Sequence, residues 1–476
     1  MNIFTYFQKK GIDTLDVSFY RKINMWKSWY NGNVRGFSTY RVYSGQGTYN
    51  KRSRKSLGMA KKLSEDIADL LLNERVKITI SDNVTNTYVT DVLKKNHFEI
   101  KGNEYQERKA YLGTVAYVPY LYDVEADQNG KILSGKIGIN YFSADNIYPV
   151  SWENGAVTEC IFTIVKTVNR KKYIQLQYHK LEEQQYVIEN TVLECITGSQ
   201  EGREVTPDEW KKLKPFRDLV PRMETGSPEA QFVLDRLNIV NNVDEDESNP
   251  MGVAIFANAI DILKKLDIEY DSYSNEFELG RKRIFVAPEM LQYKDGSPAF
   301  DPEDSLFYKL PEDYYGEDGV GGKEMIHEVN LDLRVESHSK AINDDLNYLS
   351  LKCGFGTERY KFEGGQVKTA TEVISVNSDM YRMIQKHEII LGDAIKNLIA
   401  IIIRLGIVLG ESLNKNAEVG IDFDDSIIED KQAERTSDRQ DVSMGAMTLT
   451  EYRAKWYGET EEVAAGKIQQ PAEVIE

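Results

Sequence analysis

The side chains best suited to acid–base, metal or thiol chemistry are scattered along this chain. The five histidines stand far apart, at His97, His179, His327, His338 and His387. No pair of them has the HExxH spacing that places two ligands on one helix face, and no cysteines have zinc-site spacing. The three cysteines, Cys160, Cys195 and Cys353, are isolated, as is typical of buried thiols in a reducing compartment. We therefore expect no metal site, no cofactor and no catalytic residues.

One glycine-rich segment approaches a nucleotide-binding motif. In Gly321-Gly322-Lys323-Glu324 a glutamate stands where the motif needs Ser or Thr to hold magnesium, and the first glycine has the wrong offset. Carboxylates cluster at residues 422–430, but in an acidic chain such a run is more often a solvated face than a catalytic pair. These patterns favour a protein that is not an enzyme. An enzyme whose site these patterns miss is the competing interpretation.

Composition limits the class of partner. The 476 residues are 41% hydrophobic and carry a net charge of -17, which predicts a globular chain of two or three domains. A surface that binds nucleic acid tightly would be basic. If DNA is a partner, the protein should guide it without holding it tightly.

A very long helix is the main element that must position any site. The apolar seam from Val373 to Leu409 runs for about ten turns without a proline, which predicts a rod of roughly 60 Å. Its second half is apolar on nearly every side. Charged residues, including Asp393, Lys396 and Arg404, interrupt the window that a membrane span requires. We expect a buried central helix and no membrane partner.

Two further helices and a glycine-rich loop precede this rod. A helix is predicted from Pro250 to Leu279 and another from Leu333 to Cys353, each with a narrow apolar stripe. Residues 282–329 should form a small strand-containing module between them. The segment Gly354–Lys368 has four glycines in its first twelve residues and mixes charges with aromatics, which predicts an exposed loop.

The remaining segments predict an α+β fold. Helices are expected at 13–30 and 56–73, and a series of strands follows residue 113, with hairpin turns such as Asn154-Gly155 and Asn169-Arg170. Residues 31–53 should be a loop that ends in the basic cluster Lys51–Lys55. That cluster is either a solvated loop or a contact to phosphate or to an acidic neighbour. The last predicted elements of the chain are a strand at 419–424 and a charged helix near 429–440.

This order of segments resembles the portal proteins of tailed double-stranded-DNA bacteriophages, in the siphophage-type branch. The similarity rests on Leu57–Glu74, Asn249-Pro250, Gly354-Phe355-Gly356, Lys368–Val373 and Ile421–Ser426. It covers nearly the whole chain and lies in the order of the motifs more than in one signature. The resemblance implies a multidomain ring subunit. Its expected parts are a wing (1–249), two stem helices (250–281 and 332–353), a clip (282–331), a tunnel loop (354–368), a long wing helix (369–412) and a crown (413–476).

The resemblance also implies partners and a location. The ring would be a homododecamer at one vertex of the virion capsid, assembled in the host cytoplasm, with DNA packaged and ejected through its channel. The implied protein partners are the large terminase subunit, the major capsid and scaffolding proteins, and a head-completion adaptor. A ring-forming adaptor or scaffold of the head–tail connector that does not conduct DNA is the alternative.

Two groups of site residues follow from this placement. Charges of the tunnel loop would line the DNA channel, or else bridge neighbouring loops: Glu358, Arg359, Lys361, Glu363 and Lys368. A head-to-tail ring needs a face against each neighbour, and the apolar seams of the long helices could supply it. The predicted interface residues are Ile255, Ile262, Leu266, Tyr270, Ile342, Leu346, Ile384 and Leu391.

Overall fold

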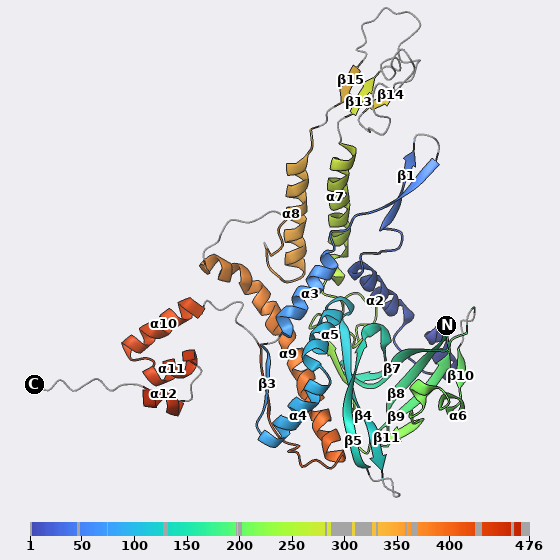
Figure 1. Ribbon diagram of the computed structural model, residues 1–476, viewed down its shortest axis with the longest axis vertical. Helices are drawn as coiled ribbons and strands as arrows, with labels where there is room; N and C mark the ends of the chain where they lie inside the picture. Colours follow the sequence, from blue (N-terminus) through green and yellow to red (C-terminus); the bar gives the residue numbers. More distant parts are fainter. Residues whose placement is uncertain are drawn as a thin grey trace, which may run out of the picture.

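The computed structural model shows an elongated α+β molecule, as predicted (Figure 1). A body of helices and sheets carries two long helices that rise from it, with a small sheet at their far end. The structure describes residues 2–44, 48–73, 75–126, 132–196, 198, 202–280, 283–286, 307–309, 326–329, 332–357, 359–362, 370–423, 431–457 and 461–467.

Five helices form the first part of the body. They are α1 (Ile3–Lys10), α2 (Val17–Tyr30), α3 (Met59–Leu71), α4 (Asn83–Lys95) and α5 (Phe98–Leu112). The side chain of Asp16 caps α2 by accepting from the Ser18 amide at 2.7 Å. The predicted helices at 13–30 and 56–73 are confirmed. Their apolar faces, with Trp26, Leu63 and Ile67 fully buried, pack in one large core.

Two antiparallel sheets complete the body. One has the order β12-β4-β5, from β4 (Thr114–Ala126), β5 (Ile132–Ser143) and β12 (Val233–Arg236). The other has the order β10-β9-β8-β7-β6, and β11 also pairs with β9. Its strands are β6 (Ile147–Glu153), β7 (Ala156–Val168), β8 (Lys171–Glu182), β9 (Gln185–Glu194), β10 (Arg203–Val205) and β11 (Arg222–Glu224). The short helix α6 (Pro207–Trp210) follows β10. The predicted hairpin turns at Asn154-Gly155 and Asn169-Arg170 are confirmed, with positive φ at all four residues.

The two rising helices are α7 (Ile260–Leu279) and α8 (Val335–Lys352), which pack side by side (Figure 1). The strands β13 (Arg283–Val286), β14 (Phe307–Lys309) and β15 (Ile326–Val329) form the small sheet beyond them. The predicted helix start at Pro250 is wrong. The Gly252 amide donates to Thr114 and the Ile255 amide donates to the Ala110 carbonyl, each at 2.8 Å, so this segment is bonded to the body before the helix begins.

The longest helix, α9 (Ala370–Val408), has the predicted length and packs onto the chain's own body. It contacts α3 and α4 as well as β4, β5 and β12, which explains why its second half is apolar on nearly every side. Leu391, Ile395 and Leu398 are fully buried there. Within the described segments, none of the helices combines the length and apolar character needed to cross a membrane.

The last elements tie back to the body or stand beside it. Strand β16 (Val419–Asp422) pairs with β3 (Lys77–Ile80), which confirms the predicted strand near 419. Helices α10 (Lys431–Met444), α11 (Leu449–Tyr457) and α12 (Glu461–Lys467) form a separate group (Figure 1). In this group the guanidinium groups of Arg435 and Arg439 each donate to the Tyr452 hydroxyl at 3.1 Å.

A buried ion pair joins the helices to the central sheet. The Lys109 ammonium of α5 donates to both carboxylate oxygens of Asp235 in β12, at 2.8 and 3.1 Å, and both side chains are fully buried. Gln106 and Tyr117 donate to the same carboxylate, at 2.7 and 3.3 Å. Burial lowers the pKa of Lys109, while the charge of Asp235 opposes that shift. The carboxylate is therefore satisfied by donors from α5 and β4.

Two buried histidines also lie in the body. Among the described residues, neither ring nitrogen of His179 has a hydrogen-bond partner, and its ring makes T-shaped contacts with the rings of Phe162 and Phe232. His387 of α9 accepts from the Asn238 amide through Nδ1 at 3.0 Å. Burial lowers the pKa of each imidazole to about 3, and for His387 the charges of Lys109 and Lys386 add to the effect.

These histidines predict an acid-sensitive fold. Because the folded pKa of each lies below that of the unfolded chain, the stability they contribute is complete above pH 6.5 and falls between pH 6.5 and 3. As the pH falls through this range, we expect each histidine to lower the free energy of unfolding by up to roughly 1.4 kcal/mol per pH unit. In urea unfolding, His179→Leu should show a shallower fall than wild type between pH 7 and 5. The exposed His97→Asn should follow wild type, and parallel curves for His179→Leu would contradict the assignment.

Candidate nucleic-acid and subunit interfaces

The segment after α8 is anchored by its aromatic side chains. Gly354 and Gly356 have φ of 84° and 75°, left-handed values that favour glycine and that turn the chain at the end of the helix. Between them, Phe355 is 1% exposed and its ring lies 5.7 Å from that of Tyr360. The expectation of a wholly exposed loop is therefore wrong for this part of it.

Two further contacts fix the same segment. The Tyr360 hydroxyl donates to the Asp66 carboxylate of α3 at 2.8 Å, and burial with the nearby negative charge raises the pKa of Tyr360. The Phe362 amide donates to the side chain of Asn343 in α8 at 2.7 Å, and the Phe362 ring packs against the ring of Tyr273 in α7. Residues 354–362, apart from 358, are thus held against α3, α7 and α8.

The structure places only some of the predicted DNA-channel residues. Arg359 lies between the anchored aromatics, with its guanidinium 3.9 Å from the Asp66 carboxylate and about a third of its side chain exposed. Lys361 is exposed. Glu358, Glu363 and Lys368 lie outside the described residues.

The predicted subunit-interface residues are inside the chain's own core. Of the eight, only Tyr270 is half-buried, and its ring lies near that of Phe362. The other seven are at most 8% exposed in the single chain: Ile255, Ile262, Leu266, Ile342, Leu346, Ile384 and Leu391. The stripes of α7 and α8 face each other, and that of α9 faces the body. These seven side chains have almost no area left to bury against another copy, so their burial in the single chain does not support the predicted interface.

Other apolar side chains on the two rising helices are exposed. Ile268 of α7 is 47% exposed, and Tyr348 and Leu351 of α8 are 50% and 52% exposed. The periodicity of the sequence did not single them out, because they lie off the regular seams. Together with Phe277 of α7, which is 44% exposed, they are the large apolar groups that another molecule could cover among the described side chains of these two helices.

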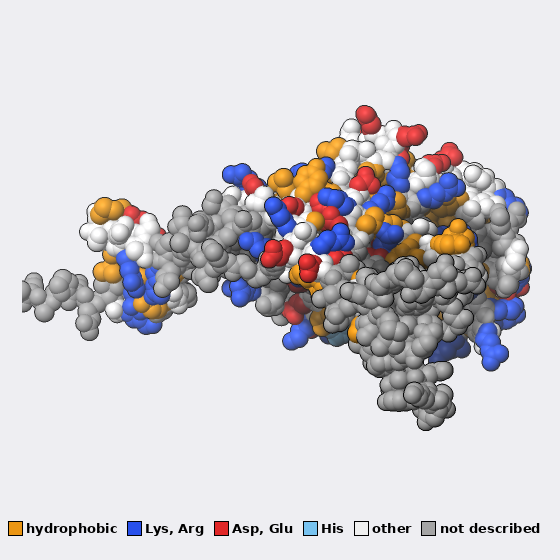
Figure 2. All heavy atoms as spheres, turned by 90° about the horizontal axis from the view of Figure 1, so that it is seen from above, with side chains coloured by type: hydrophobic (Ala, Val, Ile, Leu, Met, Phe, Trp, Pro, Cys, Tyr) orange, Lys and Arg blue, Asp and Glu red, His pale blue; other side chains and the backbone are white. Residues whose placement is uncertain are grey.

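Charges of both signs cover the described part of the body seen from above (Figure 2). Acidic and basic side chains are interspersed there and do not form a face of one sign. The net charge of -17 is therefore not concentrated on this view of the single chain.

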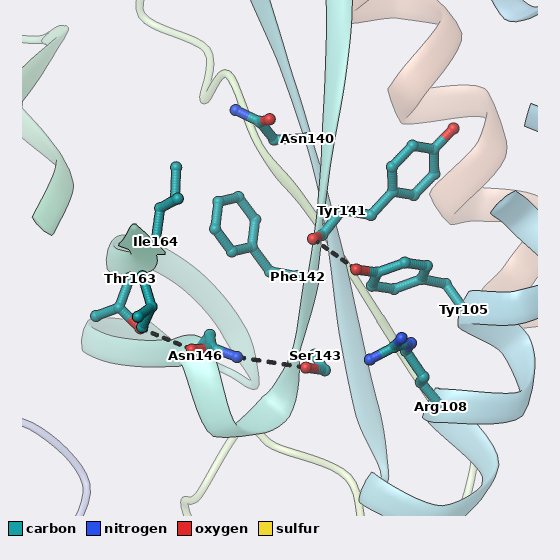
Figure 3. Close-up of a pocket in the computed structure, with 10 residues that line it drawn as sticks. Tyr105, Arg108, Asn140, Tyr141, Phe142, Ser143, Asn146, Thr163 and Ile164 are labelled. Carbon is teal, nitrogen blue, oxygen red and sulfur yellow. Dashed lines mark hydrogen bonds between the residues drawn. The ribbon is translucent and has the colours of Figure 1, made fainter. Parts of the chain in front are cut away.

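A pocket of about 340 Å³ lies between α5, β5 and β7 (Figure 3). Several of its polar side chains already form hydrogen bonds within the chain. Tyr105 donates to the Tyr141 carbonyl at 2.9 Å, and Thr163 donates to Asn146 at 3.0 Å. Arg108 is the one charged residue in the lining, and its guanidinium lies over the Tyr105 ring. The lining lacks the carboxylate or imidazole that an acid–base pair would need.

Side chains that could bind a metal ion are not clustered in the part of the chain that the structure describes. No group of three or more His, Cys, Asp or Glu side chains has a metal-binding arrangement among those residues. The thiols of Cys160 and Cys353 are buried, and burial raises their pKa values, whereas Cys195 is half-buried. A raised pKa keeps them protonated and unreactive at neutral pH.

Comparison with known proteins identifies the family. No curated protein matches the chain. A family model described as "Phage portal protein, SPP1 Gp6-like" matches residues 12–473, which is nearly the whole sequence. Membership in this family implies a structural, non-enzymatic protein of the virion that acts in genome packaging. The chain belongs to the SPP1 Gp6-like family of phage portal proteins.

Proposed function

We propose that the protein is the ring subunit of a channel at one capsid vertex, through which the genome is packaged and later ejected. The observation that carries the proposal is the family match over residues 12–473. The terminase motor would dock during filling, and head-completion proteins would replace it afterwards. ATP hydrolysis belongs to the motor in this scheme.

The parts of the subunit are assigned by the same proposal. The body up to residue 249 and helix α9 form the wing, α7 and α8 form the stem, and the small sheet at their far end belongs to the clip. Residues 354–368 form the tunnel loop, and the group α10–α12 forms the crown. The elongated arrangement of α7 and α8, which project from the body, supports this assignment (Figure 1).

Contacts between copies would use the outer faces of the stem. The apolar seams of α7 and α8 are buried against each other within the chain. A neighbouring copy can therefore cover only exposed side chains such as Ile268, Tyr348 and Leu351. A head-to-tail ring repeats one such contact until it closes. The proposed contact is therefore between different surfaces of adjacent copies.

The tunnel loop would present its charges to DNA. Tyr360 and Phe362 pack inward, so Arg359 and Lys361 alternate with anchored residues and are held near the turn. Together with Lys368 they would contact phosphates, and the negative charges of Glu358 and Glu363 would weaken that attraction. Few cationic contacts suit a channel in which DNA must slide, because affinity grows with each phosphate neutralised.

Charge reversal in the loop tests this function. We expect Lys361→Glu with Lys368→Glu to leave ring assembly intact and to reduce the number of genome-filled heads several-fold in an in vivo packaging assay. The matched control is Lys212→Glu, an exposed lysine beside α6. Electron microscopy of the purified rings should show an axial hole wide enough for a duplex.

The outcomes separate the possible functions. A closed ring without such a hole would favour an adaptor that does not conduct DNA. Rings that package normally with both substitutions would contradict the DNA contact but not the ring. A wild-type chain that stays monomeric at all concentrations would contradict the portal function.

A further inference from the structure

A two-stranded hairpin projects from the molecule without joining any larger sheet. It consists of β1 (Thr39–Ser44) and β2 (Thr48–Ser53), which pair only with each other. In Figure 1 it stands beside α7, on the opposite side from α8. The sequence predicted a loop here. An isolated two-stranded ribbon is marginally stable in water, so an exposed one is a candidate for covering by a partner.

The base of the hairpin is fixed to α7. Asp271 of α7 accepts from the Tyr40 hydroxyl at 2.9 Å and from the Lys55 amide at 3.0 Å. One turn earlier, Asp267 accepts from the Ser56 hydroxyl and the Leu57 amide at 3.0 and 2.9 Å. The ribbon is thereby held in one direction before any partner arrives, which lowers the entropy cost of docking.

One face of the ribbon points away from α7. Side chains alternate along a strand, and Tyr40 points toward Asp271, so the next residue faces outward. The register pairs Arg41 with Lys51 and Tyr43 with Tyr49, which places all four on this outer face. The two tyrosines are 60% and 66% exposed, with ring centroids 5.5 Å apart.

The charges on this face are uncompensated. Arg41 and Lys51 lie directly opposite each other, an arrangement of like charges that destabilises a strand pair. Among the described residues, neither has a carboxylate partner. The hairpin range 39–53 contains three cations and no acidic residue, in a chain of net charge -17. The face therefore suits a partner that offers carboxylates beside an apolar surface.

The opposite side of the stem has that chemistry. The exposed stripe of α8 holds two carboxylates, one lysine and two large apolar side chains: Glu336, Lys340, Asp344, Tyr348 and Leu351. It lies on the helix face away from α7, since the intervening Ile342 and Leu346 are buried. The two surfaces lie on opposite sides of the α7–α8 pair, as adjacent copies in a head-to-tail ring require (Figure 1).

We propose that the outer face of the β1–β2 hairpin docks on the exposed stripe of α8 in a second copy of this chain. Arg41 and Lys51 meet Glu336 and Asp344, and the tyrosine pair covers Tyr348 and Leu351. This contact rests on the proposed ring and names the surfaces that close it. It also gives the basic cluster near residue 51 an acidic neighbour as its partner.

Photo-crosslinking in mixed assemblies tests the contact. Chains with benzoylphenylalanine at position 43 are assembled with isotope-labelled wild-type chains, irradiated and digested. We expect crosslinked peptides that join an unlabelled hairpin to a labelled segment from 335–352. The control places the probe at Tyr457 of α11, which is 55% exposed, and should not crosslink to α8.

Charge reversal gives a second measurement. Arg41→Glu with Lys51→Glu should raise the protein concentration needed for assembly by about threefold to tenfold, as expected for two partly exposed ion pairs. Adding Glu336→Lys and Asp344→Lys should restore assembly. The control is Lys9→Glu with Lys10→Glu at the end of α1, which should leave assembly unchanged.

Several results would overturn the contact. Rings that form normally while the probe labels only its own chain, or a different surface of the neighbour, would remove this contact and leave the ring standing. Crosslinking to duplex DNA added to the rings, in place of α8, would make the face a nucleic-acid contact. Failure of the wild-type chain to oligomerise would contradict the ring and the contact together.

Discussion

Replacing Lys109 with methionine should destabilise the protein by about 3–5 kcal/mol, because the change leaves a buried carboxylate without its counter-charge. Both Lys109 and Asp235 are fully buried, and the ammonium reaches both carboxylate oxygens. Gln106 and Tyr117 remain as donors, but neither supplies a positive charge. The effect should appear in urea unfolding as a lower midpoint with an unchanged slope.

Lys101→Met is the matched control for this substitution. Lys101 lies on the same helix and pairs with Glu104, but both side chains are nearly half exposed. Its loss should cost at most about 1 kcal/mol. The double variant Lys109→Met, Asp235→Leu should recover part of the lost stability, since no charge is then left buried. Equal effects of Lys109→Met and Lys101→Met would contradict the role of the pair.

Phe355→Ala should cost about 3–5 kcal/mol, the usual penalty for emptying a fully buried aromatic site. The ring is 1% exposed and contacts Tyr360, so its loss also loosens the segment that Tyr360 ties to Asp66. Thermal unfolding should report the change as a lower midpoint. In the packaging assay, the same variant should fill fewer heads even where rings still form.

Thr357→Ala is the control for Phe355→Ala. Thr357 lies two residues away in the same turn, but it is exposed. Substitutions at exposed sites outside special features usually change stability by less than about 0.5 kcal/mol. If Phe355→Ala were as neutral as Thr357→Ala, the segment would not be anchored. Deleting the whole loop is a poorer test, because it would remove a core side chain along with the charges.

Local patterns in the sequence predicted most of the helices and strands correctly. The apolar period and the absence of proline predicted α9 to within a few residues, and turn residues predicted the hairpins between β6, β7 and β8. These features succeed because backbone geometry depends on neighbouring residues. Where the prediction failed, at Pro250 and at residues 31–53, bonds to distant residues decided the structure. Thr114 and Ala110 hold residues 252–255, and Asp271 holds the base of the hairpin.

The sequence alone determined which faces of the long helices are apolar, how long the helices are, and the family to which their order is similar. Only the tertiary structure decided what those faces touch. A stripe such as Ile262 and Leu266 must leave water, but its period is the same whether the partner is another helix of the chain or another copy. Likewise, Lys109 and Asp235 stand 126 residues apart, and only the fold brings them within 2.8 Å. Burial depends on contacts between distant residues, whereas helical period depends on local ones, and this difference separates the correct predictions from the wrong ones.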